Sequence, residues 1–139
     1  MRHESTADIP APVQQVWDVL IDVERWPEWT PTMRRVEILD GATLAEGTRV
    51  RVRQPRLPVL VWTVDEVRPG EAFSWVSGPA AGRTRATHEL TVLPDGGTRI
   101  ALALVQRGLS AVFGALSTGL TKAYLRTEAE SLRARCSAG

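Results

Sequence analysis

The central part of the chain, residues 33–105, is dominated by segments in which apolar and polar residues alternate, and this pattern restricts the fold more than any other feature. A period of two is typical of β-strands with one buried face. Pro-Gly in "RPGE" and Asp-Gly in "PDGGT" are turn signals, and each predicts a hairpin between the strands that flank it. Consecutive hairpins make an antiparallel sheet. The strands predicted here are MRRVEIL, TRVRVRQ, VLVWTVDEV, AFSWVS, RATHELTVL and RIALALVQ.

The residues before this part predict one more strand and a helix. "RHESTADI", residues 2–9, alternates, and its inner face carries small side chains on which a bulky element can pack. In "PAPVQQVWDVLID", residues 10–22, apolar residues recur at intervals of three and four, which is typical of an amphipathic helix. Pro12 suits its first turn, where the missing N–H sacrifices no hydrogen bond. The helix should end before Pro27, and a second short helical turn fits residues 23–26.

The last part of the chain predicts a long helix, from about residue 109 to residue 135. Its apolar stripe comprises Leu109, Phe113, Leu116, Leu120 and Tyr124, continued by Leu125, Ala129 and Leu132. The helix also holds small residues, which mean either tight contact or empty space, among them Gly114, Ala115, Thr118 and Gly119. An antiparallel sheet with one covered face and a long helix across it is an α+β architecture. We expect a single domain that spans residues 1–139.

The composition narrows the classes of partner. The 139 residues include 17 basic and 16 acidic side chains, a balance that gives no long-range attraction to nucleic acid or to an anionic membrane. No apolar run reaches the roughly 18 residues that span a bilayer. The first ten residues lack the apolar centre of a secretory signal. We therefore expect a cytoplasmic protein, monomer or homodimer, that binds no nucleic acid and inserts into no membrane.

The number and spacing of the cysteine and histidine residues argue against the common types of metal site and nucleophilic active site. Cys136 is the one cysteine, so it cannot build a multi-cysteine metal site, and an inert thiol near the C-terminus explains it. His3 and His88 are accompanied by no His-x-Glu or Cys-x-x-Cys spacing. No Gly-x-Ser-x-Gly elbow and no glycine-rich phosphate loop is present. The sequence predicts no metal and no cofactor.

Residues 9–31, "IPAPVQQVWDVLIDVERWPEWTP", follow a pattern of strand end, Val-Trp helix, Asp and Trp-Pro-x-Trp. This pattern resembles the opening of the START-like, or SRPBCC, superfamily. Its members include polyketide cyclase/dehydrase-like proteins, lipid-transfer START domains and the birch-pollen allergen family. "THELTVLPDGGTRIAL" and "AESLRAR" resemble the last hairpin and the last helix of the same superfamily, so the resemblance covers nearly the whole chain.

The resemblance implies a helix-grip fold, in which a curved antiparallel sheet of about seven strands wraps the C-terminal helix. Two short helices follow the first strand, and an apolar cavity lies between sheet and helix. Trp26 and Trp29 would then either cap the cavity or plug the end of the core. The residues expected to contact a ligand are Trp26, Trp29, Trp62, Trp75, His88, Leu102, Leu104, Phe113, Leu116 and Tyr124.

His88 is the candidate for chemistry, because alternation places it on the inner face with Leu90 and Val92. A neutral imidazole there can serve as general acid or base toward a bound carbonyl compound. A core histidine with one hydrogen bond is the competing interpretation. Tyr124 either presents its hydroxyl to a ligand or sends it to solvent at the rim.

Two functions fit these features. The first is a protein that binds a hydrophobic small molecule, polyketide- or lipid-like, in the cavity. The second is a cyclase/dehydrase-type enzyme that acts on a polyketide-like substrate in the same cavity, with His88 as acid or base. A protein-interaction module is a third interpretation. An acid/base pair facing the cavity would favour the enzyme, whereas a filled cavity and an exposed apolar patch would favour the interaction module.

Overall fold

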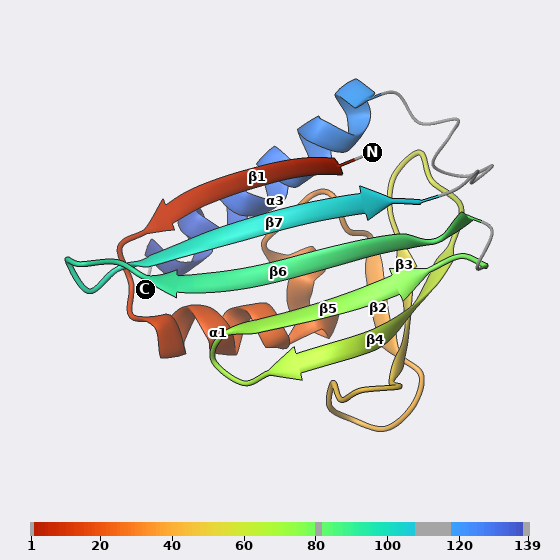
Figure 1. Cartoon of the computed structure of the whole chain (residues 1–139), viewed down its shortest axis with the longest axis horizontal. Helices are drawn as coiled ribbons and strands as arrows, with labels where there is room; N and C mark the ends of the chain where they lie inside the picture. The colour runs from red at the N-terminus through yellow and green to blue at the C-terminus, as the bar shows by residue number, and fades with distance from the viewer. Residues whose placement is uncertain (1, 80–81, 108–117, 138–139) are drawn as a thin grey trace.

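The structure is a computed structural model, and it describes residues 2–79, 82–107 and 118–137. Strands and helices follow one another along the chain as the alternation and the helical periodicity predict (Figure 1). The elements are β1 (Arg2–Ile9), α1 (Val13–Ile21), the 3-10 helix η1 (Val23–Glu28), β2 (Arg35–Ile38), β3 (Arg49–Arg53), β4 (Leu60–Arg68), β5 (Ala72–Ser77), β6 (Thr84–Val92), β7 (Thr98–Gln106) and α3 (Thr118–Ser137).

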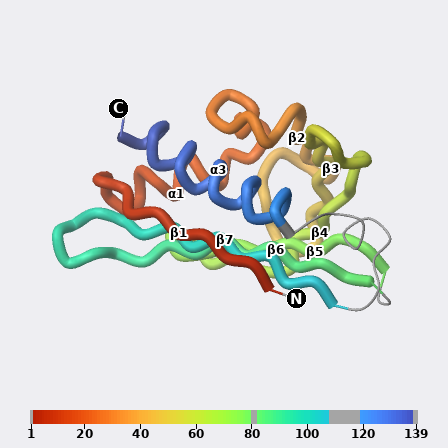
Figure 2. The backbone as a smooth tube through the Cα atoms, turned by 90° about the horizontal axis from the view of Figure 1, so that it is seen from above, coloured from red at the N-terminus to blue at the C-terminus, as the bar shows by residue number. Residues whose placement is uncertain are grey.

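The seven strands form one antiparallel sheet in the order β1-β7-β6-β5-β4-β3-β2. α3 packs on β1, β7 and α1. Figure 2 shows α1 and α3 on the same face of the sheet, with β2 and β3 rising beside them. The predicted α+β helix-grip architecture, including two short helices after the first strand, is therefore confirmed. The predicted first part of the long helix, residues 109–117, lies outside the described residues.

The small inner side chains of β1 make room for α3. Ser5 and Ala7 are half-buried and Ile9 is buried, whereas the residues between them are exposed. Because these inner side chains are short, the helix can approach the edge of the sheet closely, and Leu125, Ala129 and Leu132 of α3 are buried in the core. The inner face of β1 and the buried face of α3 thus form one apolar layer.

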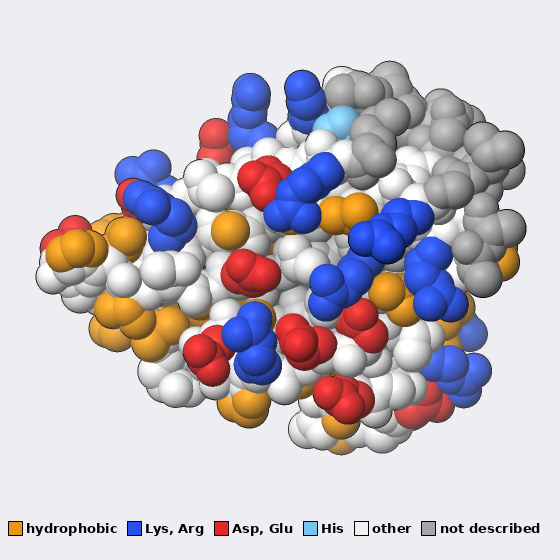
Figure 3. Space-filling view, in the orientation of Figure 1, with side chains coloured by type: hydrophobic (Ala, Val, Ile, Leu, Met, Phe, Trp, Pro, Cys, Tyr) orange, Lys and Arg blue, Asp and Glu red, His pale blue; other side chains and the backbone are white. Residues whose placement is uncertain are grey.

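The outer face of the sheet carries charges of both signs (Figure 3). Arg99 on β7 pairs with Asp8 on β1 at 2.7 Å, and Arg85 on β6 pairs with Asp65 on β4 at 2.9 Å. Arg49, Arg51 and Arg53 form the exposed side of β3, as alternation predicts, and Arg49 pairs with Asp40 at 3.0 Å. This face is solvated, so water and salt screen these ion pairs and each contributes little to stability.

The far end of β6 departs from the prediction. Alternation places Val92 on the inner face with His88 and Leu90, yet Val92 is 61% exposed. The reason is that the β6–β7 hairpin projects past the helices, as Figure 2 shows, so nothing covers the last residue of the strand. The turn itself has Gly96 at φ 88°, and Asp95 Oδ1 accepts the backbone N–H of Gly97 at 2.9 Å.

Trp26 lies at the centre of the core, where the chain leaves α1 and crosses toward the sheet. It is 2% exposed, and its Nε1–H donates to the carbonyl of Leu20 at 2.9 Å. The ring centroid lies 5.4 Å from that of Trp75 and 5.5 Å from that of His88. Pro27 is accommodated because η1 is a short 3-10 segment, which lacks a full ladder of helical hydrogen bonds. Trp26 is therefore anchored both in the helical layer and against the sheet.

Candidate functional site

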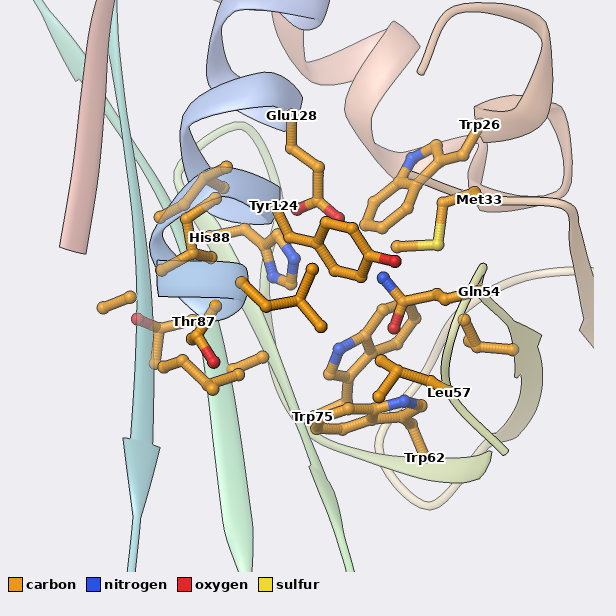
Figure 4. A pocket seen from close by; sticks show the side chains of 18 residues that line it. Trp26, Met33, Gln54, Leu57, Trp62, Trp75, Thr87, His88, Tyr124 and Glu128 are labelled. Carbon is orange, nitrogen blue, oxygen red and sulfur yellow. The ribbon is translucent and has the colours of Figure 1, made fainter. Parts of the chain in front are cut away.

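An apolar pocket lies between the sheet and α3, and Figure 4 shows the side chains that surround it. It receives residues from η1, from the segment after η1, from five strands and from α3. Its described lining is Trp26, Met33, Val52, Gln54, Leu57, Trp62, Trp75, Ala86, Thr87, His88, Leu102, Ala103, Leu104, Leu120, Thr121, Tyr124, Leu125 and Glu128.

The free volume inside this pocket is about 70 Å³. Pockets that hold drug-sized molecules have volumes of about 300–1,000 Å³, and an engineered cavity that holds benzene measures about 150 Å³. The free volume of this pocket is thus smaller than that of a cavity that holds benzene. Its walls must move apart before even a single aromatic ring can bind there.

Most of the residues expected to contact a ligand face this pocket. Six of them are among its lining: Trp62, Trp75, His88, Leu102, Leu104 and Tyr124. Trp26 also lines it, so this residue both fills the core and borders the pocket. Trp29 does not belong to the described lining; it packs edge-on against Trp26 with the ring centroids 5.8 Å apart. Phe113 and Leu116 lie outside the described residues.

His88 is held as a neutral imidazole. Its ring stacks on Phe73 of β5, with centroids 4.1 Å apart and planes 10° apart. Nδ1 lies 3.2 Å from the Phe73 carbonyl oxygen, which can only accept, so Nδ1 carries the proton and Nε2 is an acceptor. Burial lowers the pKa of His88 to about 4, because the charged ring would lose its hydration. An imidazole with this pKa is a weak base near neutral pH.

Glu128 on α3 is the pocket residue that the sequence analysis missed. It is 9% exposed, and burial raises the pKa of its carboxyl group to about 7, partly offset by a hydrogen bond from Thr32. Thr32 Oγ1 donates to Glu128 Oε1 at 3.1 Å. The signal was present in the sequence, because the stripe of Leu120 and Tyr124 continues at the same four-residue interval to Glu128.

Tyr124 uses its hydroxyl in a third way, neither toward a ligand nor toward solvent. The hydroxyl donates to the carbonyl oxygen of Pro55, in the segment that connects β3 and β4. Gln54 and Leu57 of this segment line the pocket, and Arg56 within it adopts a left-handed backbone with φ 67°. The contact from Tyr124 to Pro55 therefore ties one wall of the pocket to α3.

Among the small residues singled out in the last helix, Gly119 is the one whose exposure the structure describes. Gly119 is exposed, whereas its neighbours Leu120 and Thr121 face the pocket. Gly114 and Ala115 lie outside the described residues. On the sheet, Ala86 is a short side chain on the same face of β6 as His88, and it lines the pocket.

Across the described ranges, no cluster of three His, Cys, Asp or Glu side chains is arranged to hold a metal ion. None of the helices in these ranges is long and apolar enough to cross a membrane.

Known proteins resemble this chain in sequence and in fold. A Streptomyces halstedii protein named "Putative polyketide cyclase" is 38% identical over 84 residues, which are 60% of this chain and 66%, just under two thirds, of that protein. A START superfamily protein from Mycobacterium smegmatis has a similar structure, with a TM-score of 0.73 and 15% identity over 97% of this chain and 96% of the other. The di-domain ARO/CYC StfQ of the steffimycin biosynthetic pathway gives a TM-score of 0.73 and 16% identity over 97% of this chain and 44% of StfQ.

The two structural likenesses show the fold. The match to a sequence family is broader, because it runs over residues 2–137 and so includes every described element from β1 to α3. The chain belongs to the family described as polyketide cyclase/dehydrase and lipid transport proteins.

Proposed function

We propose that the protein binds a hydrophobic small molecule, polyketide- or lipid-like, in the pocket between the sheet and α3. The observation that carries this proposal is the presence of two buried ionisable groups, His88 and Glu128, on the wall of a largely apolar pocket. Burying a polar group without its full set of hydrogen bonds costs about 1–3 kcal/mol. A ligand with polar atoms of its own would complete those hydrogen bonds.

The family supports the same function. Its description joins cyclase/dehydrase activity with lipid transport, and both require an apolar site for a small molecule. Pockets of this kind are mostly apolar and contain a few polar groups that fix the orientation of the ligand.

Filling the pocket from α3 is expected to abolish this binding. Thr121 lines the pocket, whereas its neighbour Lys122 is exposed, so Thr121→Phe and Lys122→Phe place the same ring inside and outside the site. With 2-heptanone or the neutral dye N-phenyl-1-naphthylamine as probe, Thr121→Phe should weaken binding at least tenfold and Lys122→Phe less than twofold. Saturable changes in tryptophan or dye fluorescence measure the affinity.

Two results would count against the proposal. One is that neither probe gives a saturable change with the unmodified protein. The other is that both substitutions weaken binding equally, since the probe would then occupy a site other than the pocket.

A cyclase/dehydrase activity is the second candidate, and Glu128 is the observation that favours it. A general acid works best when its pKa is near the working pH, and the pKa of Glu128 is raised to about 7. His88, with a pKa lowered to about 4, is the weaker partner. In this proposal the carbon next to one carbonyl loses a proton to solvent water and attacks the second carbonyl carbon. Glu128 donates its proton to the oxygen of that second carbonyl and is reprotonated from solvent, and water leaves in a later step.

The linear diketone 2,6-heptanedione tests this candidate, because its intramolecular aldol reaction and loss of water give 3-methylcyclohex-2-enone. An enzyme of this kind should form the product faster than buffer does, and Glu128→Gln should lower the rate by about 10²–10⁴-fold. NMR follows both species. A rate equal to that in buffer removes catalysis of this reaction and leaves the binding proposal standing.

A further inference from the structure

Glu128 is the acidic member of a pocket wall whose described residues offer a ligand no cation. Among the described lining residues there is no Lys and no Arg, and Glu128 alone carries a carboxyl group. Figure 4 shows Glu128 pointing from α3 into the space that Trp26 and Tyr124 also face. The group is therefore placed to touch whatever enters the pocket.

The hydrogen bonds around Glu128 favour one oxygen of its carboxyl group as the site of the proton. Thr30 Oγ1 accepts the backbone N–H of Thr32 at 3.3 Å and lies 2.9 Å from Thr32 Oγ1. If Thr30 donates to Thr32, then Thr32 donates to Glu128 Oε1 at 3.1 Å, and every hydroxyl proton in the chain has an acceptor. Oε1 is thus an acceptor, and no described residue bonds to Oε2. With the hydroxyl protons in this order, the proton of the neutral acid lies on Oε2.

From this geometry we infer that Glu128 selects the ligand: its carboxylic acid donates a hydrogen bond to a carbonyl oxygen of an uncharged molecule, and the pocket rejects a carboxylate of the same shape. This inference rests on the proposed binding function and names the chemical class of the ligand. It separates neutral ketones and related carbonyl compounds from free fatty acids and other organic anions.

Electrostatics explain the rejection of anions. A buried carboxylate ligand needs a cation or several donors to replace its hydration. Besides Glu128, the titratable groups in the described lining are His88 on β6 and Tyr124 on α3, and His3 lies on the inner face of β1. The buried residues of α1 are apolar, and β7 contributes Leu102, Ala103 and Leu104 to the lining. His88 is neutral, so it gives an anion no compensating charge.

Three probes of nearly equal size test the inference: acetophenone, which has a carbonyl; ethylbenzene, which lacks it; and benzoate, which is an anion at pH 5.5. Each is titrated into the whole protein, and the indole N–H signals of the tryptophans report binding. At pH 5.5 acetophenone should bind at least tenfold more tightly than ethylbenzene, and benzoate at least tenfold more weakly than acetophenone.

Two variants identify Glu128 as the cause. Glu128→Gln keeps an N–H donor at every pH, so it should retain the preference for acetophenone at both pH 5.5 and pH 8.5. The unmodified protein should lose the preference at pH 8.5, where Glu128 is ionised. Glu128→Leu has no donor, and its ratio of acetophenone to ethylbenzene affinity should fall to about 1 at both pH values.

The outcomes separate the two proposals. If all three probes bind the unmodified protein equally, or if Glu128→Leu keeps the preference for acetophenone, the pocket binds ligands and the inference about Glu128 is wrong. If no probe binds at any pH, the proposed function itself fails. If Glu128→Leu does not fold, the pH dependence of the unmodified protein and its absence in Glu128→Gln decide the matter.

Discussion

Replacing Trp26 with alanine is expected to lower the free energy of unfolding by about 3–5 kcal/mol, the range typical of large aromatic side chains removed from a core. Trp26 is 2% exposed and touches Trp29, Phe73, Trp75 and His88, so its loss leaves a cavity bounded on several sides. The neighbours cannot close that cavity unless η1 shifts toward the sheet. Urea unfolding followed by circular dichroism measures the change.

Trp29→Ala is the matched control, three residues away in the same segment. Trp29 is only partly buried, and its Nε1 has no hydrogen-bond partner among the described residues. Its removal should therefore cost less than half as much as that of Trp26. Trp26→Phe should lie between the two, because it keeps a ring but leaves the Leu20 carbonyl without the indole donor, at a cost of about 1–3 kcal/mol. A larger loss for Trp29→Ala than for Trp26→Ala would contradict the placement of Trp26 at the centre of the core.

Stability should depend on pH in opposite directions through the two buried groups of the pocket. The pKa of Glu128 is about 7 in the folded protein and about 4.5 without burial. The folded state therefore holds this proton more tightly, and the resulting stability is present below pH 4.5 and is lost as pH rises through 7. The free energy of unfolding of Glu128→Gln, relative to the unmodified protein, should rise by about 3 kcal/mol between pH 4.5 and pH 7.5.

The contribution of His88 to the free energy of unfolding changes with pH in the opposite direction. Its pKa is about 4 in the folded protein and 6.5 without burial, so the unfolded state holds the proton more tightly. Stability is fully present above pH 6.5 and falls as pH drops through 4. His88→Phe, which preserves the stacking on Phe73, should gain about 3 kcal/mol relative to the unmodified protein between pH 7 and pH 4.

Each variant controls for the other, since surface carboxylates contribute equally to all three proteins and cancel in the differences. Two difference curves with the same sign of slope, or two flat curves, would contradict the assignment of both groups as buried and neutral. Guanidinium or urea titrations at half-unit pH intervals give the curves.

The sequence predicted the sheet well because the alternation of residues reports directly on strands that have one buried face. Val50 and Val52 are buried, and Arg49, Arg51 and Arg53, which alternate with them, are exposed, as the pattern required. The turn signals in the two hairpins are equally local, and Gly70 and Gly96 both have positive φ. Such features depend on neighbours along the chain, so a single sequence is enough to find them.

The pocket was predicted less completely because it depends on contacts between distant segments. Glu128 continues the stripe of Leu120 and Tyr124, but it was overlooked since a glutamate among charged residues on a helix normally faces water. Its hydrogen-bond partner Thr32 lies 96 residues earlier in the chain, so the local sequence does not reveal that contact. The contact of Tyr124 with Pro55 spans 69 residues and has no local signature either. The prediction that Val92 faces the core was wrong for a related reason. Alternation gives the face of the sheet on which a side chain lies, but not how far the helices that cover this face extend.

The five tryptophans allow one measurement that tests the central claim directly. Trp26, Trp62 and Trp75 line the pocket, whereas Trp17 and Trp29 are absent from its described lining. In a titration with acetophenone at pH 5.5, the indole N–H signals of the first three should shift together with one dissociation constant, and that of Trp17 should stay in place. Equal shifts of all five signals, or a shift confined to Trp17, would show that the probe does not enter the pocket between the sheet and α3.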